Sequence, residues 1–512
     1  MVAGVSVAIL LVPQSLAYAR LAGMPPYIGL YAAALPPLAA AFFASSPYLQ
    51  TGPVALTSLL TFGALSTLAP PGSPEYVQLG GLLAVVVGLT RVGIGFFKAG
   101  DVAFLMSEPV LRGFTLGATV LILASQLPGA LGVEADGGVL GGAATALGQA
   151  GSWEMEAIGL SALTLLLIVG GRRLHPLVPG VPLAAAAGLG ATLLLGYGGA
   201  VMGEIPARLP PITLDLPWRQ LPRIALAGVV IAFVGFAEAA SIARIYATRE
   251  RQHWDANRDF VSQGVANLAA AVSGGYPVGG SFSRSSLSHL MGARTRWSGA
   301  VTGVVVLVFL PFADLLAPLP TAVLSAIVMA SVFSLFELRP VLNLWRISRP
   351  QFAVAGVTFG LTVLLSPHVE QAVVLGILFA IGIHLWREFH VQLESRADGL
   401  ELHLHPQGVL WFGSAEVLKA SILDLVVDHP DAARVILHME RLGRIDLTAA
   451  LVLEGLIDDL EEAGLEVKVE DIHPRTARAL RGVLARARLE AWRGRPEPPE
   501  TPGAREPPEP PS

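Results

Sequence analysis

Long apolar runs recur through residues 2–385 and restrict the fold of this chain more than any other feature. A helix needs roughly 17–25 mostly apolar residues to cross a hydrocarbon core of about 30 Å. Charged residues make up only 14% of the 512 residues, whereas a soluble globular chain carries roughly 25%. The sequence therefore predicts an all-α polytopic membrane protein in contact with lipid.

About fourteen spans are predicted from the lengths of these runs. They lie at residues 2–18, 28–43, 50–68, 77–97, 102–127, 157–169, 181–197, 224–246, 259–273, 276–290, 299–316, 321–338, 352–365 and 369–385. Two of them, at 50–68 and 276–290, are interrupted by Gly, Pro and hydroxyl residues. We expect a membrane domain over residues 1–388.

Basic residues gather in one set of the predicted loops, which includes Lys98, Arg172 and Arg387. The opposite set includes residues 70–76 and 128–156, which carry acidic residues and no Lys or Arg. Lys and Arg mark the cytoplasmic side of a membrane, so we expect an inner-membrane protein with both termini in the cytoplasm. Three arginines before residue 224 break the pattern: Arg208, Arg219 and Arg223.

The remaining composition excludes several classes of function. Cysteine is absent, so the chain has no disulfide and no thiolate metal site. A net charge of −5 argues against a nucleic-acid partner. No nucleophile–base pair, metal cluster or phosphate-binding loop stands out, so we expect neither an enzyme nor ATP-driven transport, and no metal or organic cofactor.

The two interrupted stretches are Gln-Thr-Gly-Pro-Val at 50–54 and Tyr-Pro-Val-Gly-Gly-Ser-Phe-Ser-Arg at 276–284. Interrupted segments at corresponding places in two halves of a membrane chain point to a transporter's binding site. Each stretch is predicted to turn into a half-helix, near Ala55 and Ser283 respectively. Helix N-termini carry unpaired N–H groups and partial positive charge, and glycines such as Gly52 let a ligand approach the backbone. The pattern predicts an anion site.

Each stretch follows a helix with a polar residue, Gln14 in the first half and Glu238 in the second, at a similar separation. Seven spans in each half would insert with opposite orientation, which makes an inverted repeat of about 1–198 and about 222–388. Chance similarity in a sequence rich in Gly and Ala is the alternative.

Arg284 adds a full positive charge to the second stretch, either for anion binding or as a structural partner of Glu238. Glu238 lies among apolar residues, where a charge is costly and often functional. Its protonation would relieve repulsion of an anion and so couple proton uptake to anion uptake. Sodium is the alternative driving ion. The structural alternative is a salt bridge from Glu238 to Arg284 or Arg244. Gln14 and Tyr18 are one helical turn apart and are predicted to face the site together.

The chain changes character after residue 388. Strands are predicted at 400–404, 409–412, 434–439 and 466–469, and helices at 415–428, 447–463 and 474–485. Alternating strands and helices indicate a small cytoplasmic α/β domain over 389–490. The Pro- and Glu-rich tail, 491–512, is predicted to be disordered.

At 13–37 the sequence reads PQSLAYARLAGMPPYIGLYAAALPP, and TGP at 51–53 and GGSFSRSS at 279–286 follow. These motifs resemble the sulfate permease (SulP) family of anion transporters. The resemblance implies fourteen spans as two inverted repeats, divided into core and gate domains, with the anion between the ends of the third and tenth spans. It implies a coupling role for Glu238, and substrate-site roles for Gln14, Tyr18, Gly52, Val54, Ser283 and Arg284. Family substrates include sulfate, bicarbonate, chloride, oxalate and other dicarboxylates.

The C-terminal domain is similar to the STAS domain of that family, on Val-Ile-Leu-His-Met at 435–439 and Ile-Asp-Leu-Thr-Ala at 445–449. Thr448 falls where related anti-sigma antagonists carry a phosphorylated Ser. Because Leu447 and Ala449 depart from the Asp-Ser-Ser-Gly pattern, we favour a capping role for Thr448 over phosphorylation.

The leading hypothesis is a secondary anion transporter that works by alternating access, as a homodimer in the membrane. An anion channel or anion-sensing protein, with the soluble domain as its output, is the alternative. A nucleobase transporter is disfavoured because a neutral base does not need the charge of Arg284.

Overall fold

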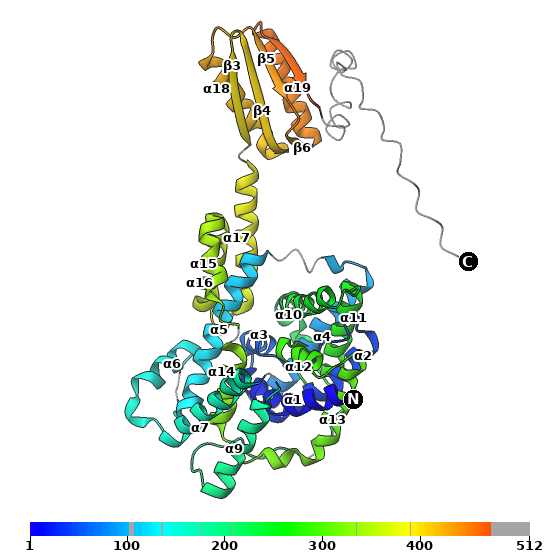
Figure 1. Cartoon of the computed structure of the whole chain (residues 1–512), viewed down its shortest axis with the longest axis vertical. Coiled ribbons are helices and arrows are strands. Elements are labelled where there is room, and N and C mark those ends of the chain that lie inside the picture. Colours follow the sequence, from blue (N-terminus) through cyan, green and yellow to red (C-terminus); the bar gives the residue numbers. More distant parts are fainter. Residues whose placement is uncertain are drawn as a thin grey trace, which may run out of the picture. The chain divides into compact units, whose positions relative to one another are not determined.

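The computed structural model describes residues 1–101, 107–134, 137–175, 177–206, 208–333, 335–389 and 391–472. The chain divides into two compact units, Met1–Ala380 and Ile381–Ser512, shown from blue to yellow and from yellow to orange in Figure 1. The predicted helix at 474–485 and the predicted tail at 491–512 lie outside the described residues.

The first unit is helical, as the apolar runs predicted. Its helices are α1 (Val2–Leu21), α2 (Pro26–Phe43), α3 (Ala55–Leu65), α4 (Pro74–Phe96), α5 (Glu108–Leu131), α6 (Val139–Gly148), α7 (Met155–Leu165), α8 (Gly171–Leu174), α9 (Gly180–Leu195), α10 (Leu221–Arg249), α11 (Ala256–Val272), α12 (Phe282–Leu290), α13 (Trp297–Phe309), α14 (Thr321–Phe333), α15 (Leu338–Ile347), α16 (Arg349–Leu364) and α17 (Val369–Phe389). A π-helical turn, Leu166–Gly170, joins α7 to α8. Within the described residues, 9 helical segments are long and apolar enough to cross a membrane, which confirms the polytopic membrane fold.

The two halves of this unit begin with the same order of elements. The first half runs α1, α2, β1 (Thr51–Gly52) and α3, and the second runs α10, α11, β2 (Gly279–Gly280) and α12. The strands pair antiparallel, with Thr51 opposite Gly280 and Gly52 opposite Gly279. The interrupted segments therefore lie side by side and run in opposite directions, as an inverted repeat requires.

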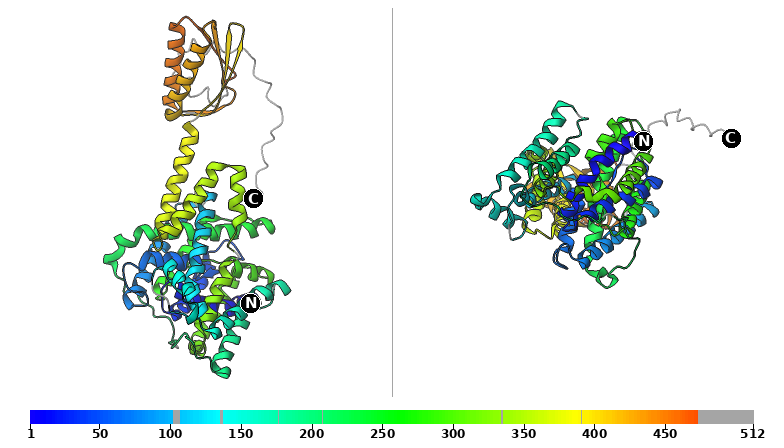
Figure 2. Two further views of the ribbon diagram at one scale, coloured as in Figure 1. Left: turned by 90° about the vertical axis from the view of Figure 1, so that its left-hand side faces the viewer. Right: turned by 90° about the horizontal axis from the view of Figure 1, so that it is seen from below.

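The helices of the first unit pack in two groups (Figures 1 and 2). One group joins α1, α2, α3, α4, α10, α11, α12 and α13, and the other joins α5, α7, the π-helical turn, α9, α14 and α16. Small residues allow the close contacts that membrane helices use in place of a hydrophobic driving force. For example, a Cβ atom on Gly88 of α4 would lie 2.9 Å from the carbonyl oxygen of Gly264 on α11.

The described part of the second unit contains a five-stranded sheet with two helices packed on it, which confirms the predicted α/β class. The order is β3 (Gln392–Asp398), β4 (Glu401–Leu410), β5 (Arg434–His438) and β7 (Glu466–Glu470), while β6 (Leu442–Ile445) also pairs with β4. Only the β3–β4 pair is antiparallel among these strands. The helices α18 (Phe412–Asp428) and α19 (Leu447–Glu462) lie together on one face (Figure 2).

The prediction of separate strands at 400–404 and 409–412 is wrong, because one strand, β4, covers residues 401–410. The pairing of β4 with β6 shifts its register between Gly408 and Val409, and Gly408 adopts a φ of 117° at this shift. Strands β3 and β6 were not predicted. Six of the seven residues of β3 are exposed, so this edge strand lacks the alternation of apolar and polar residues that marks a half-buried strand.

Candidate functional site

A cavity of about 660 Å³ lies between the two groups of helices. From the first group it is lined by Tyr18 on α1, Val54 before α3, and Glu238 on α10, among others. From the second group it is lined by Ile168 in the π-helical turn and Ser331 on α14. Four of the predicted site residues line it, namely Tyr18, Val54, Glu238 and Ser283, whereas Gln14, Gly52 and Arg284 are buried and are not among its lining residues.

Two half-helices begin at this cavity, as the sequence predicted. Helix α3 begins at Ala55 after Val54, which provides no side-chain cap, so its first N–H groups face the cavity without a capping side chain. Helix α12 begins at Phe282, and Ser281 caps it by accepting from the Arg284 N–H at 3.5 Å. The hydroxyls of Ser281 and Ser283 lie 3.3 Å apart and both residues line the cavity. The arrangement offers donors and partial positive charge to an anion.

Arg284 joins the two interrupted segments. It is fully buried, at 0% exposure, and its Nη1 donates to the carbonyl oxygen of Pro53 at 2.9 Å. Among the described residues, its Nε and Nη2 atoms have no hydrogen-bond partner. A Cβ atom on Gly52 would lie 3.4 Å from Nη2, and Gly52 has a φ of +152° that favours glycine. The guanidinium therefore brings a buried charge to the first interrupted segment, although it comes from the second.

Glu238 is half-buried on α10 and lines the cavity. Within the part of the chain that the structure describes, no ion pair joins it to Arg284. Of the two salt bridges that were the structural alternative, the one to Arg284 is therefore not formed. The carboxylate instead shares a cavity with the hydroxyls of Ser281 and Ser283.

Gln14 and Tyr18, which were predicted to face the site together, differ in their surroundings. Tyr18 lines the cavity and is 4% exposed. Gln14 is fully buried, and its Nε2 donates to Ser331 Oγ at 3.3 Å. It therefore ties α1 to α14, across the two helix groups.

A buried network around Gln50, which the sequence did not reveal, holds the interrupted segments together. Its backbone N–H donates to Ser285 Oγ at 2.9 Å. Its Nε2 donates to Ser288 Oγ at 3.1 Å and to Ser298 Oγ at 3.0 Å. Its Oε1 accepts from Thr302 Oγ1 at 3.4 Å. The first interrupted segment is thereby bonded to α12 and α13.

Arg91 on α4 is a second fully buried arginine. Its Nε and Nη2 donate to the carbonyl oxygens of Ala232 and Ile231 on α10, at 3.0 and 3.2 Å, and its Nη1 donates to Val278 O at 3.1 Å. It positions α10 and the second interrupted segment. A charge inside the predicted span at 77–97 was the available signal, because such charges are seldom exposed to lipid.

Helix α11 also holds both interrupted segments. Gln263 Nε2 donates to Thr51 Oγ1 at 2.7 Å. The Asn267 side chain accepts from Val278 N at 2.9 Å and donates to Val278 O at 3.1 Å, as a paired strand would. The two Asn267 contacts satisfy backbone groups of Val278 that an interrupted helix leaves without partners.

Thr448 in the second unit is exposed in the first turn of α19. The prediction that it caps this helix is wrong. Asp446 is the N-cap residue, and its Oδ1 accepts from the Ala449 N–H at 2.8 Å. Aspartate is among the preferred N-cap residues.

The fold and the cavity define a multi-pass membrane protein with a buried site between two helix groups. Residues 1–358 match the model of the sulfate permease family, and residues 392–489 match that of the STAS domain. The chain therefore belongs to the sulfate permease family. It is an anion transporter with a STAS domain and not an enzyme.

Comparison with individual known proteins supports the assignment of this chain to the family. The probable sulfate transporter MT1781 of Mycobacterium tuberculosis is 30% identical over 90% of this chain and 87% of its own length. The structure of the murine Solute Carrier 26 family member A9 anion transporter in the inward-facing state has a TM-score of 0.87 at 19% identity, over 94% of this chain and 86% of that chain. The transmembrane domain of the cyanobacterial bicarbonate transporter BicA has a TM-score of 0.63 at 22% identity, over 75% of this chain and 96% of that chain. Both structures are similar in fold.

Proposed function

We propose that this protein is a secondary active transporter that carries sulfate across the membrane together with a proton, by alternating access. One observation carries the proposal: the fully buried Arg284 has two nitrogens without a hydrogen-bond partner among the described residues, beside two half-helix ends at one cavity. Sulfate is the proposed substrate because the family and the mycobacterial relative are named for it.

The anion is held by the ends of α3 and α12. The first N–H groups of α3 and the hydroxyls of Ser281 and Ser283 are the donors that reach the cavity. Arg284 supplies positive potential from its buried position, where its charge is shielded from water and hence acts over a longer range. Gly52 and Val54 shape the first interrupted segment, and Tyr18 closes one side of the pocket.

Glu238 carries the coupled proton. Its carboxylate lines the cavity that would hold the dianion. An ionised carboxylate repels sulfate, whereas a protonated one can donate a hydrogen bond to it. Binding of the anion and binding of the proton therefore favour each other, and this reciprocal coupling is what symport requires.

Alternating access is a motion of the two helix groups past the site. The cavity has walls from both groups, so a shift of one against the other changes which end is open. Arg172 and Glu337 are exposed and line the same cavity. Arg172 belongs to a connection that the distribution of basic residues assigns to the cytoplasm, and Glu337 lies at the end of the predicted span 321–338.

The test is uptake of radiolabelled sulfate by purified protein in liposomes. An imposed pH gradient, acidic outside, should accelerate uptake, and a sodium gradient should not. Glu238→Gln should still exchange sulfate but lose the acceleration, while the exposed Glu75→Gln serves as a matched control that keeps it. An unchanged response of Glu238→Gln to the pH gradient would remove the proton role. Unlabelled sulfate, bicarbonate, chloride and oxalate as competitors test the choice of sulfate. If the other anions reduce the uptake and unlabelled sulfate does not, sulfate is not the substrate.

We further propose an inner-membrane homodimer with both termini in the cytoplasm. Because the chain contains no cysteine, Val2→Cys and Ser512→Cys give single labelling sites. A membrane-impermeant maleimide should label both only after the cytoplasmic face is exposed, and labelling from outside intact cells would contradict this orientation.

Light scattering should give twice the chain mass of 53.5 kDa, and a single chain mass would contradict the dimer.

A further inference from the structure

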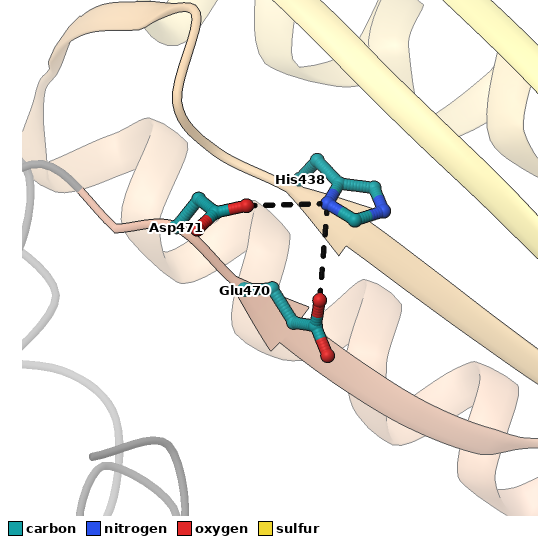
Figure 3. Close-up of side chains that lie close together, drawn as sticks. All are labelled: His438, Glu470 and Asp471. Atoms are coloured by element: carbon teal, nitrogen blue, oxygen red, sulfur yellow. Dashed lines mark ion pairs between the residues drawn. The ribbon is translucent and has the colours of Figure 1, made fainter. Parts of the chain in front are cut away.

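The second unit brings three metal-binding side chains together at the ends of two neighbouring strands. His438 ends β5, Glu470 ends β7 opposite it, and Asp471 follows directly. Their ligand atoms all lie within 4.8 Å of one another. Figure 3 shows both carboxylates directed at the same ring nitrogen, Nδ1 of His438. Strand pairing, and not spacing along the sequence, creates this cluster.

The distances from the ring nitrogen of His438 to the two carboxylates are longer than those of hydrogen bonds and leave room for an ion. His438 Nδ1 lies 3.5 Å from Asp471 Oδ2 and 3.9 Å from Glu470 Oε2. A direct N–H···O hydrogen bond spans roughly 2.7–3.2 Å. Two ligands on a tetrahedral zinc ion, each at about 2.0–2.2 Å from the metal, lie roughly 3.4 Å apart. The gap between the ring and the carboxylates therefore suits an ion.

A hydrogen-bond chain leaves the facing nitrogen of His438 free to bind a metal. His403 Nδ1 and His438 Nε2 are 3.0 Å apart, so one donates to the other. In the tautomer in which His403 Nδ1 accepts, His438 Nε2 is the donor and His438 Nδ1 carries a lone pair that faces the carboxylates.

The ring of His438 is also fixed in orientation. His405 on β4 stacks on it at 4.3 Å between centroids and 6° between planes. A metal-binding histidine commonly donates its other ring N–H to a fixed acceptor, which sets its tautomer and orientation. His403 and His405 supply such support here.

The two carboxylates have features that suit ligands. Among the described residues, no lysine or arginine forms an ion pair with Glu470 or Asp471. Asp471 adopts φ 57°, a left-handed conformation uncommon for a residue other than glycine. Such conformations cost free energy and concentrate at functional sites. At 52% and 45% side-chain exposure, the carboxylates leave the position open to an ion and to water.

We propose that His438, Glu470 and Asp471 bind a divalent transition-metal ion of the zinc class. One imidazole and two carboxylates suit such an ion, with water as the remaining ligand. Magnesium and calcium prefer oxygen ligands, so they bind here more weakly. A bound ion would fasten the end of β7 to the end of β5. This inference is independent of the transported anion.

The test uses the full chain, without an affinity tag that contains histidine, after treatment with a chelator. After equilibrium dialysis against zinc chloride, mass-spectrometric metal analysis counts the tightly bound zinc ions per chain. The wild type should hold one zinc ion more than His438→Gln does. Asp471→Asn and Glu470→Gln should each weaken this binding at least tenfold. The supporting variant His403→Gln should weaken it by about 10–100-fold. His429→Gln, another histidine of the same unit, is the matched control and should bind as the wild type does.

Two further measurements, the absorption of bound cobalt(II) and the unfolding temperature, test the proposal even if one variant folds poorly. Cobalt(II) should give visible absorption bands of a four-coordinate site in the wild type and in His429→Gln, but not in Asp471→Asn. Zinc should raise the unfolding temperature of the wild type, and excess magnesium should not. Equal zinc content in the wild type and all three ligand variants would show adventitious binding and overturn the proposal, as would the absence of tight binding in the wild type.

Discussion

Gly280 tests how closely α10 must pack on the second interrupted segment. A Cβ atom at this position would lie 2.8 Å from Leu49 Cδ1, and 3.0 and 3.1 Å from Ala239 Cβ and Cα. Leu49 can rotate its side-chain end away, but the backbone of Ala239 moves only if α10 moves. Because Glu238 precedes Ala239, Gly280→Ala displaces the proposed proton carrier from the half-helix ends.

The expected cost follows from these contacts. Overpacking of a well-packed interior costs roughly 1–3 kcal/mol, which corresponds to roughly 5–150-fold in an equilibrium between competent and displaced states. Sulfate uptake by Gly280→Ala in liposomes should therefore fall at least about fivefold. The variant should still insert and elute as the wild type does on size exclusion, because the strain is confined to one helix contact.

Two further glycines provide graded controls. A Cβ atom on Gly279 would lie 3.2 Å from Val54 Cγ2 and 3.4 Å from Thr57 Cγ2, so Gly279→Ala should have a smaller effect. A Cβ atom on Gly356 would meet nothing within 4 Å, and Gly356→Ala should transport normally. Adding Leu49→Ala to Gly280→Ala removes the shortest contact and should restore part of the uptake. Full uptake by Gly280→Ala would refute the reasoning.

Three other predictions concern residues outside the cavity. Arg91→Met removes the hydrogen bonds to the carbonyl oxygens of Ala232, Ile231 and Val278, of which Val278 O keeps Asn267 as a donor. The variant should therefore destabilise the membrane unit by about 3 kcal/mol, measured as a lower unfolding temperature in detergent. An unchanged unfolding temperature would show that water replaces the guanidinium. Asp446→Ala should cost about 1 kcal/mol of stability in the second unit, whereas Thr448→Ala should cost much less; the reverse order in thermal unfolding would restore the capping role of Thr448. The Arg434 guanidinium lowers the pKa of Glu466 by hydrogen bonding, so this pair stabilises the fold above the unfolded pKa of the carboxyl and loses that effect as the pH falls through the folded value. Arg434→Ala should therefore reduce stability slightly at neutral pH and low salt, and not in strong acid; a loss that persists in strong acid would contradict the pairing.

The parts of the fold that depend on local sequence were predictable. The interrupted segments follow from Gly, Pro and hydroxyl residues that are adjacent in the chain, and α3 and α12 begin at Ala55 and Phe282, close to the predicted positions. The cap of α19 is Asp446, two residues before the predicted Thr448.

The parts that depend on tertiary contacts were not predictable. Gln50 lies in a predicted interrupted segment, yet its partners are 235–252 residues away in sequence. The direction of Gln14 depends on Ser331, which is 317 residues away. Helical periodicity places Gln14 on the same face as Tyr18, but only the packing of α14 decides which of them reaches the cavity.

Equilibrium binding of radiolabelled sulfate to the purified protein tests the central claim most directly. The account predicts saturable binding that Arg284→Ala weakens at least tenfold, while Arg112→Ala, an arginine paired with Glu108 at 2.5 Å on a more exposed face of α5, binds as the wild type does. Size exclusion of both variants checks that they remain folded. Equal sulfate affinity in Arg284→Ala and the wild type would contradict an anion site at the ends of α3 and α12.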